Sequence, residues 1–171
     1  GNQGTLMANH MVTTDGHIWV GDAPTNRILK FDLEGNFLYS WGAPGTPAGR
    51  IACSHGITTD QDGNLYLADC FAGRVQKFDP DGNYLLQWQM PEIERGRPKG
   101  MALDHEGNIV VVEPHYSRIN HFTPEGKLVS QWGRHGRERG ELSFPRAVAI
   151  APDGSAFVSE FQIVERLQNF G

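Results

Sequence analysis

Short runs of β-branched and aromatic residues, separated by turn signals, are the dominant pattern along the chain. Four such runs follow one another in the segment 55–88, at residues 56–60, 64–69, 74–79 and 83–88. The first two are separated by Asp62-Gly63, which is a hairpin signal, and the last two by Pro80-Asp81-Gly82. No segment sustains the 3.6-residue period of an amphipathic helix. The pattern predicts an all-β protein built from units of four short antiparallel strands.

This unit recurs along the chain. Four copies align when one position is occupied by His10, His55, Lys99 and Arg146, and the repeat length is 44 to 48 residues. Such a period is typical of a four-stranded propeller blade. The expected fold is a β-propeller with three full blades and three strands of a fourth, in repeats at approximately 8–45, 53–92, 97–136 and 144–171.

The sequence also leads to predictions about both ends of the chain. Residues 1–9 match the stretch 42–54 that follows a tryptophan, so we expect them to form a loop between blades. A last blade of three strands would expose an unpaired edge, which soluble proteins normally avoid. We therefore expect further blades, from a longer parent chain or by self-association.

Composition and charge narrow the classes of function. The chain has 171 residues, 39% of them hydrophobic, with 21 glycines and 10 prolines, as suits many turns. A net charge of −5 makes nucleic acid an unlikely partner, because phosphate contacts need a basic face. No apolar run reaches the roughly 18 residues that would suggest a membrane span. The two cysteines are too few for a disulfide framework.

One position on the blade varies in its chemistry between copies. In a propeller, the start of each first strand lies at one mouth of the central channel. His10 and His55 would point toward the axis there, with Lys99 and Arg146 at the equivalent positions. Neutral imidazoles bind Zn²⁺ or similar ions. His10 and His55 either form a metal or ligand site, or lie at the channel mouth and bond only to water or backbone.

Another position repeats an acidic residue, followed by an arginine five or six residues later. Because this spacing recurs in every copy, the residues are predicted to be structural pairs that tie the loop between the second and third strands; a ring of carboxylate ligands is the alternative. The pairs are Asp22 with Arg27, Asp69 with Arg74, Glu113 with Arg118, and Glu160 with Arg166.

Basic residues gather in the inter-blade loops on the histidine face. They would steer an anionic ligand such as a carboxylate to this mouth, or be ordinary solvated loop tips. The predicted anion-binding residues are Arg50, Arg97, Lys99 and Arg137. Tyr116 and His115 share the face, with ligand contact and loop packing as the alternatives. Cys70 is expected roughly opposite His55, and Cys53 and Cys70 would be either disulfide-bonded or free.

The repeated pattern resembles the sequence motif of a known repeat family. The motif (H/P)-x-G-I-x-x-D-x-x-G-N-Φ-Y-Φ-A-D-x4-R-Φ-x-K-F-D-x-x-G, where Φ is apolar, followed by an aromatic-Gly exit such as Trp41-Gly42, resembles the NHL repeat. It covers almost the whole chain. The resemblance implies a β-propeller, usually of six blades. It does not by itself imply a function, because this scaffold carries unrelated activities.

The segments MANHMVTTDGHIWVGDAPTNRILKFDL and SHGITTDQDGNLYLADCFAGRVQKFDPDG are similar to blades of the peptidyl-α-hydroxyglycine amidating lyase family. That resemblance implies a central zinc held by three histidines, and cleavage of a carbinolamide C–N bond to an amide and glyoxylate. His10 and His55 would then be two of the metal ligands, with a third from further blades. Arg146 would anchor the carboxylate, and Tyr116 is a candidate catalytic tyrosine.

The alternative is a non-catalytic NHL propeller that binds a protein, a peptide or a small anion on its arginine-rich loop face. A third histidine, aspartate or cysteine reaching the point shared by His10 and His55 would favour metal chemistry. Secretion fits both a lyase of this type and a Cys53–Cys70 bond, so an extracellular or periplasmic location is favoured.

Overall fold

The computed structural model describes residues 8–92, 96–161 and 167–170, and within them the chain forms four antiparallel sheets. The first sheet contains β1 (Ala8–Thr14), β2 (His17–Asp22), β3 (Arg27–Asp32) and β4 (Phe37–Trp41). The second contains β5 (Ser54–Thr59), β6 (Leu65–Asp69), β7 (Arg74–Phe78) and β8 (Tyr84–Gln89). The third contains β9 (Met101–Leu103), β10 (Ile109–Glu113), β11 (Arg118–Phe122) and β12 (Leu128–Trp132). The fourth contains β13 (Pro145–Ile150), β14 (Ala156–Glu160) and β15 (Leu167–Phe170).

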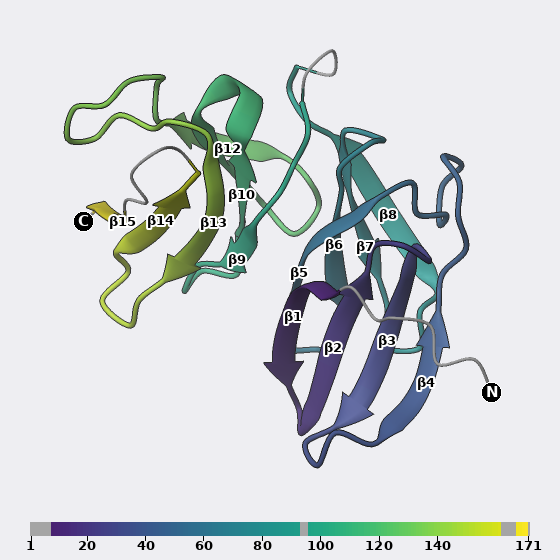
Figure 1. Ribbon diagram of the computed structural model, residues 1–171. Coiled ribbons are helices and arrows are strands. Elements are labelled where there is room, and N and C mark those ends of the chain that lie inside the picture. The colour runs from purple at the N-terminus through teal and green to yellow at the C-terminus, as the bar shows by residue number, and fades with distance from the viewer. Residues whose placement is uncertain (1–7, 93–95, 162–166, 171) are drawn as a thin grey trace.

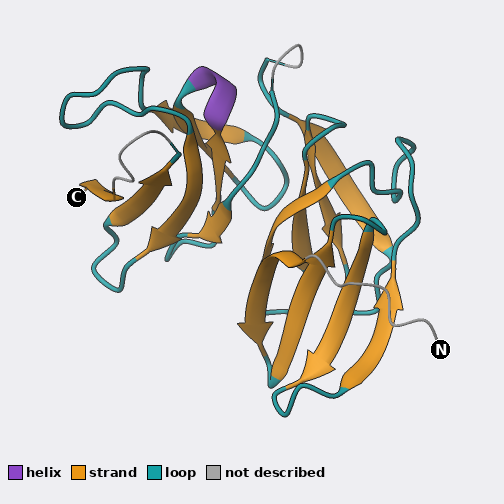
Figure 2. Cartoon of the chain, viewed as in Figure 1, coloured by secondary structure: helices purple, strands orange, loops and turns teal. Residues whose placement is uncertain are grey.

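Strands follow one another in chain order within every sheet, and Figure 1 shows the sheets side by side. The first strands of successive sheets contact each other, β1 with β5, β5 with β9 and β9 with β13. A single 3₁₀ turn, η1 (Pro114–Tyr116), is the helical element of the described residues (Figure 2). None of the described residues belongs to a helix long and apolar enough to cross a membrane. The all-β prediction, with three four-stranded sheets and one of three strands, is confirmed.

Aspartate side chains shape the hairpin tips. In the second sheet Asp60 Oδ1 accepts hydrogen bonds from the backbone N–H groups of Asp62 and Asn64, at 3.1 and 2.8 Å. The Asn64 amide donates to Asp60 Oδ2 at 2.9 Å, and Gly63 takes a φ of +78° that favours glycine. The sequence D-x-x-G-N therefore forms a closed turn, and the same side-chain bonds recur between Asp104 and Asn108.

The core is formed where neighbouring sheets face each other. The tryptophan at the end of each fourth strand packs on a phenylalanine of the next sheet, with ring centroids 4.7 Å apart for Trp41–Phe78, 5.5 Å for Trp88–Phe122 and 4.6 Å for Trp132–Phe170. Aromatic pairs at such centroid distances stabilise an interface beyond the area that they bury. The repeated tryptophans are thus inter-blade packing residues.

Two local expectations are corrected by the structure. Residues 8–9 begin β1 rather than belonging to a loop, and residues 1–7 lie outside the described residues. Cys53, not His55, lies across from Cys70, whose backbone N–H donates to the Cys53 carbonyl at 3.0 Å. The reason is a β-bulge: Ser54 pairs with Asp69 and Ile57 with Leu67, so His55 and Gly56 together oppose one residue.

Candidate functional site

The starts of β1, β5, β9 and β13 bring the variable residues of the four repeats to one end of the fold. Glycines make this close approach possible. A Cβ on Gly56 would lie 2.0 Å from the Lys99 carbonyl oxygen, and one on Gly100 would lie 2.6 Å from the Arg146 carbonyl oxygen. Since real Cβ atoms do not come so near, only glycine fits directly after His55 and Lys99. We call His10, His55, Lys99 and Arg146 the histidine mouth.

The two histidines of this mouth are neighbours. Their ring centroids lie 5.7 Å apart. Burial, followed by the charges of Lys99, His10 and Arg146, lowers the pKa of His55 to about 4. Burial and Lys99 also lower the pKa of His10. Both imidazoles are therefore neutral near pH 7, and the mouth carries the positive charges of Lys99 and Arg146.

A divalent metal fits this arrangement in part. Neutral imidazole is the form that binds metal, and His55 Nδ1 is buried without a hydrogen-bond partner in the described part of the protein. Residues 8–92, 96–161 and 167–170 contain no group of three histidine, cysteine or acidic side chains placed to hold an ion. The described residues thus bring two imidazoles together at this mouth, while a zinc site needs at least three protein ligands.

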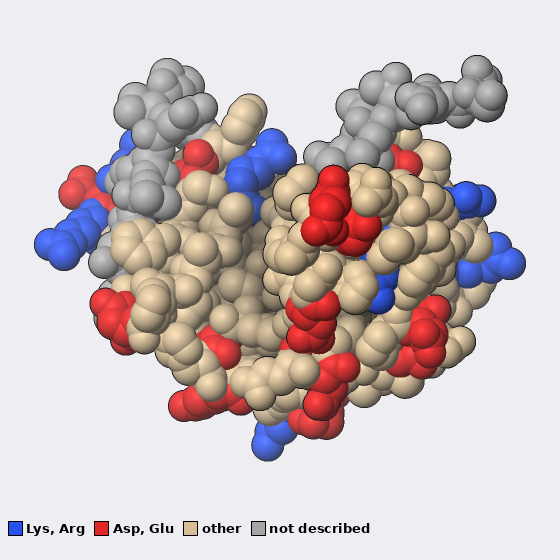
Figure 3. Space-filling view, turned by 90° about the horizontal axis from the view of Figure 1, so that it is seen from below, with Lys and Arg blue, Asp and Glu red and all other residues tan. Residues whose placement is uncertain are grey.

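Acidic residues surround the opposite end of the fold. A cavity of about 840 Å³ opens between the hairpin tips there, and its acidic lining residues are Asp15, Asp60, Asp62, Asp104, Glu106 and Glu125. Figure 3, viewed from this side, shows acidic side chains around the face. Acidic side chains therefore line the cavity at the hairpin tips, whereas the histidine mouth at the other end carries Lys99 and Arg146.

The acid–arginine repeat holds the inter-blade loops. Asp69 and Arg74 are buried and form an ion pair at 2.9 Å, and Asp69 Oδ1 accepts from the N–H groups of Ala52 and Cys53. Arg74 also donates to carbonyl oxygens of the loop before β5, those of Thr46, Pro47 and Arg50. In the third sheet Arg118 pairs with Glu113 at 2.6 Å and with Glu92 at 2.8 Å.

The other two repeats differ. In the first, Arg27 is exposed and Asp22 accepts a hydrogen bond from Thr25 instead. In the fourth, Glu160 accepts from the backbone N–H of Ser143 at 2.9 Å, and Arg166 lies outside the described residues. One sequence pattern therefore produces a buried ion pair in the second repeat, a partly buried one in the third, and none between Asp22 and Arg27.

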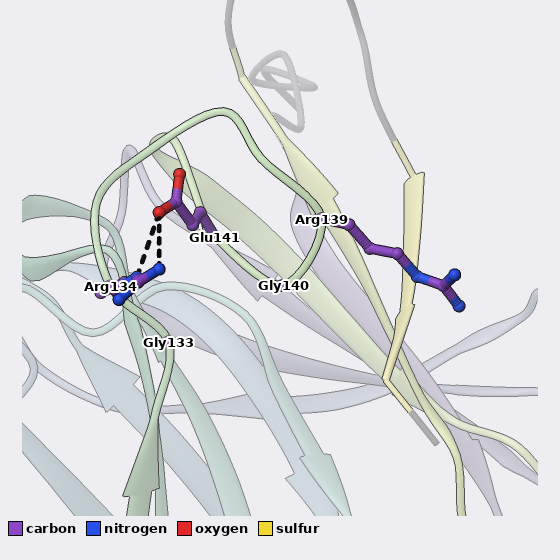
Figure 4. Close-up of a pocket in the computed structure, with 5 residues that line it drawn as sticks. All are labelled: Gly133, Arg134, Arg139, Gly140 and Glu141. Atoms are coloured by element: carbon purple, nitrogen blue, oxygen red, sulfur yellow. Dashed lines mark hydrogen bonds and ion pairs between the residues drawn. The ribbon is translucent and has the colours of Figure 1, made fainter.

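The basic loop residues lie on exposed surface. Arg50 bonds the Pro44 carbonyl of its own loop, Arg97 lies over the Phe71 ring at 5.4 Å, and Arg137 is exposed. Figure 4 shows a small pocket in the loop that follows β12, where Arg134 is paired twice with Glu141 while Arg139 points away. Of the predicted anion-binding residues, Lys99 is the one whose charge acts on the histidines.

Tyr116 lies in a different cluster, with the Arg118 guanidinium 4.6 Å from its ring. Beside the histidine mouth, a cavity of about 390 Å³ is lined by Lys99, Pro114, His115, Phe144, Arg146 and Phe161. Sequence reasoning missed Phe144 and Phe161. The signal was present in the repeats, because Cys53 and Cys70 occupy the equivalent cross-strand positions in the second copy, so these positions vary as the mouth does.

No protein-family description matches the chain, and no curated protein matches it in sequence. Solved structures do match. A streptogramin B lyase is 17% identical over 94% of this chain and 53% of its own, with a TM-score of 0.70. A catalytically inactive variant of virginiamycin B lyase from Staphylococcus aureus, with quinupristin, is 18% identical over 99% of this chain and 56% of its own, with a TM-score of 0.71.

The WD40 β-propeller domain of Doa1 is 13% identical over 97% of this chain and 51% of its own, with a TM-score of 0.65. The chain spans about half the length of these solved structures. At such low identities the likeness concerns the fold and not the activity. Together with the four antiparallel sheets, it shows that the chain has the fold of part of a β-propeller.

Proposed function

We propose that this chain supplies the ligand-binding mouth of a β-propeller, and that the ligand is a small molecule carrying a carboxylate. The proposal depends on one observation, the grouping of two neutral imidazoles with Lys99 and Arg146 at the histidine mouth. Two cations provide charge for a carboxylate, and neutral rings beside them donate or accept hydrogen bonds without competing for it. The acidic residues at the hairpin tips repel an anion and so favour its approach to the histidine mouth.

The same mouth suits a lyase of the amidating type, which the sequence resembles. In that reaction the hydroxyl proton of a carbinolamide is removed, a carbonyl forms as the C–N bond breaks, and the nitrogen takes up a proton. Lys99 and Arg146 would hold the carboxylate of the substrate, and His10 and His55 would hold a divalent ion together with a ligand from elsewhere. The ion, when bound, would act as a Lewis acid on a substrate oxygen. The matching lyase structures support the fold that this proposal needs and do not assign the reaction.

Metal content tests the lyase proposal. The chain is stripped with chelator, dialysed against limiting Zn²⁺ and analysed by mass spectrometry, beside a His10→Ala/His55→Ala double variant. About one equivalent of zinc that is lost in the double variant supports the proposal and justifies an assay of glyoxylate release from a carbinolamide. Absence of zinc from both proteins rejects His10 and His55 as a metal site of this chain.

A non-catalytic anion-binding propeller is the second candidate, favoured by the two-ligand metal set of the described residues and by the cations beside it. Calorimetry with glyoxylate separates the two. Glyoxylate binding without zinc, abolished by Lys99→Met, supports the anion site alone. Binding that is unchanged by Lys99→Met rejects the role given to the histidine mouth.

A further inference from the structure

The cavity of about 390 Å³ beside the histidine mouth combines two cations with two phenylalanine rings. Lys99 and Arg146 are shared with the mouth, whereas Phe144 and Phe161 belong to the cavity alone. The side chains are open to a ligand, since Phe144 is 40% and Phe161 is 64% exposed. A volume of this size lies in the range of small-molecule sites, which start at about 300 Å³.

Phe144 has a strained backbone that the surrounding structure maintains. Its φ is +50°, in the left-handed region that large side chains disfavour. The neighbouring Ser143 N–H donates to Glu160 Oε1 at 2.9 Å, and the Phe161 N–H donates to the Phe144 carbonyl at 3.0 Å. These two bonds fix the conformation of the segment. Strain of this kind persists where the structure over-determines a residue, and it concentrates at ligand sites.

The rings and charges of the cavity are already oriented toward one another. The Arg146 guanidinium lies 4.5 Å from the Phe161 ring centroid, and the His115 and Phe144 rings meet edge to face at 6.3 Å. An aromatic ring therefore has aromatic partners in the cavity, and a carboxylate attached to it has Lys99 and Arg146 within the same lining.

We propose that this cavity binds an aromatic carboxylate, with the ring against Phe144 and Phe161 and the carboxylate on Lys99 and Arg146. This proposal rests on the proposed function, because its carboxylate is the one assigned to the histidine mouth. It adds that the ligand carries an aromatic ring next to that carboxylate.

Calorimetry with phenylacetate, acetate and phenylacetamide tests the proposal on the full chain. We expect phenylacetate to bind at least tenfold more tightly than acetate, which lacks the ring, and than phenylacetamide, which lacks the charge. Phe144→Gly should weaken phenylacetate binding roughly 2- to 12-fold, the range expected for one lost aromatic contact. Glycine accepts the φ of this position, so the melting temperature should not fall. Arg146→Gln should reduce the preference for phenylacetate over phenylacetamide, because one of the two cations is lost.

Phe71→Ala is the matched control. Phe71 is 67% exposed and also faces an arginine, Arg97 at 5.4 Å, but it does not line the cavity, so its loss should leave phenylacetate binding unchanged. Equal affinities for phenylacetate and acetate, or wild-type binding by Phe144→Gly, would overturn the proposal. If both carboxylates bind equally and depend on Lys99, the aromatic site fails while the proposed function stands. If neither binds, both fail.

Discussion

Arg74→Met is the substitution whose effect follows most directly from the structure. The Arg74 guanidinium is 3% exposed and donates to Asp69, to Gln87 and to loop carbonyl oxygens of the first inter-blade connection. Methionine preserves most of the length of the side chain but removes every one of these donors. Asp69, fully buried, would remain without its countercharge.

Removing one partner of a buried ion pair costs about 3–5 kcal/mol, against a typical stability of about 5–15 kcal/mol for a domain. We therefore expect Arg74→Met to lower the free energy of unfolding by roughly 3–5 kcal/mol in urea titrations. Arg27→Met is the matched control, since Arg27 has the same place in the repeat but is exposed and does not pair with Asp22. Its effect should stay within about 0.5 kcal/mol.

The pH dependence adds a second check. Burial raises the pKa of Asp69 in the folded protein, so the native state holds this proton more tightly than the unfolded state does. Loss of Arg74 removes an interaction that favours the carboxylate and raises this pKa further. The stability difference between Arg74→Met and wild type should therefore shrink as the pH falls below neutrality. Equal costs for Arg74→Met and Arg27→Met, or a difference independent of pH, would refute the assignment of this pair as a buried structural lock.

Three further predictions concern the histidine mouth and its surroundings. The pKa of His55 in the folded protein is about 4, below its ordinary value of 6.5, so the unfolded state binds more protons between these two pH values. The free energy of unfolding should therefore fall as the pH drops from 6.5 to 4. A titration of His55 by NMR with a midpoint near 6.5 would contradict this prediction. Gly56→Ala should lower stability by about 1–3 kcal/mol or more, measured by thermal unfolding, since its Cβ would lie 2.0 Å from a backbone oxygen; an unchanged melting temperature would contradict the close approach of β5 and β9. Cys53 and Cys70 are free thiols rather than a disulfide. Burial raises the pKa of Cys53 to about 11, and Cys70 is 1% exposed, so both should react with iodoacetamide far more slowly at pH 8 in the native than in the unfolded protein, as followed by mass spectrometry; equal rates would show that the thiols are accessible.

The strands were predictable because their signals are local and repeated. Asp-Gly hairpin tips and alternating apolar residues fix a strand pair within about twenty residues, and four copies reduce the effect of an error in any one of them. The grouping of His10, His55, Lys99 and Arg146 also followed from the repeat, since equivalent positions in radially repeated blades must meet near one axis.

Features that depend on contacts between distant parts of the chain could not be predicted from the sequence. The bulge at His55 and Gly56 arises where two first strands pack closely, and it moved Cys70 opposite Cys53. The acid–arginine spacing is similar in the first and second repeats, yet only Arg74 of the two lies beneath a loop that supplies carbonyl acceptors. The phenylalanine-lined cavity needed the left-handed backbone of Phe144, which nothing in the residue type indicates.

The glycines at 56 and 100 have a consequence for how such a mouth changes during evolution. Backbone atoms, rather than side chains, set the spacing between adjacent first strands, because each glycine lies against the main chain of the next blade. The side chain of the residue just before each glycine therefore does not set this spacing. This position accepts histidine in one copy and lysine in another without disturbing the scaffold, so duplicated blades can diverge there one at a time. A propeller built in this way can acquire a new ligand preference through single substitutions, and a designer can exchange those same positions.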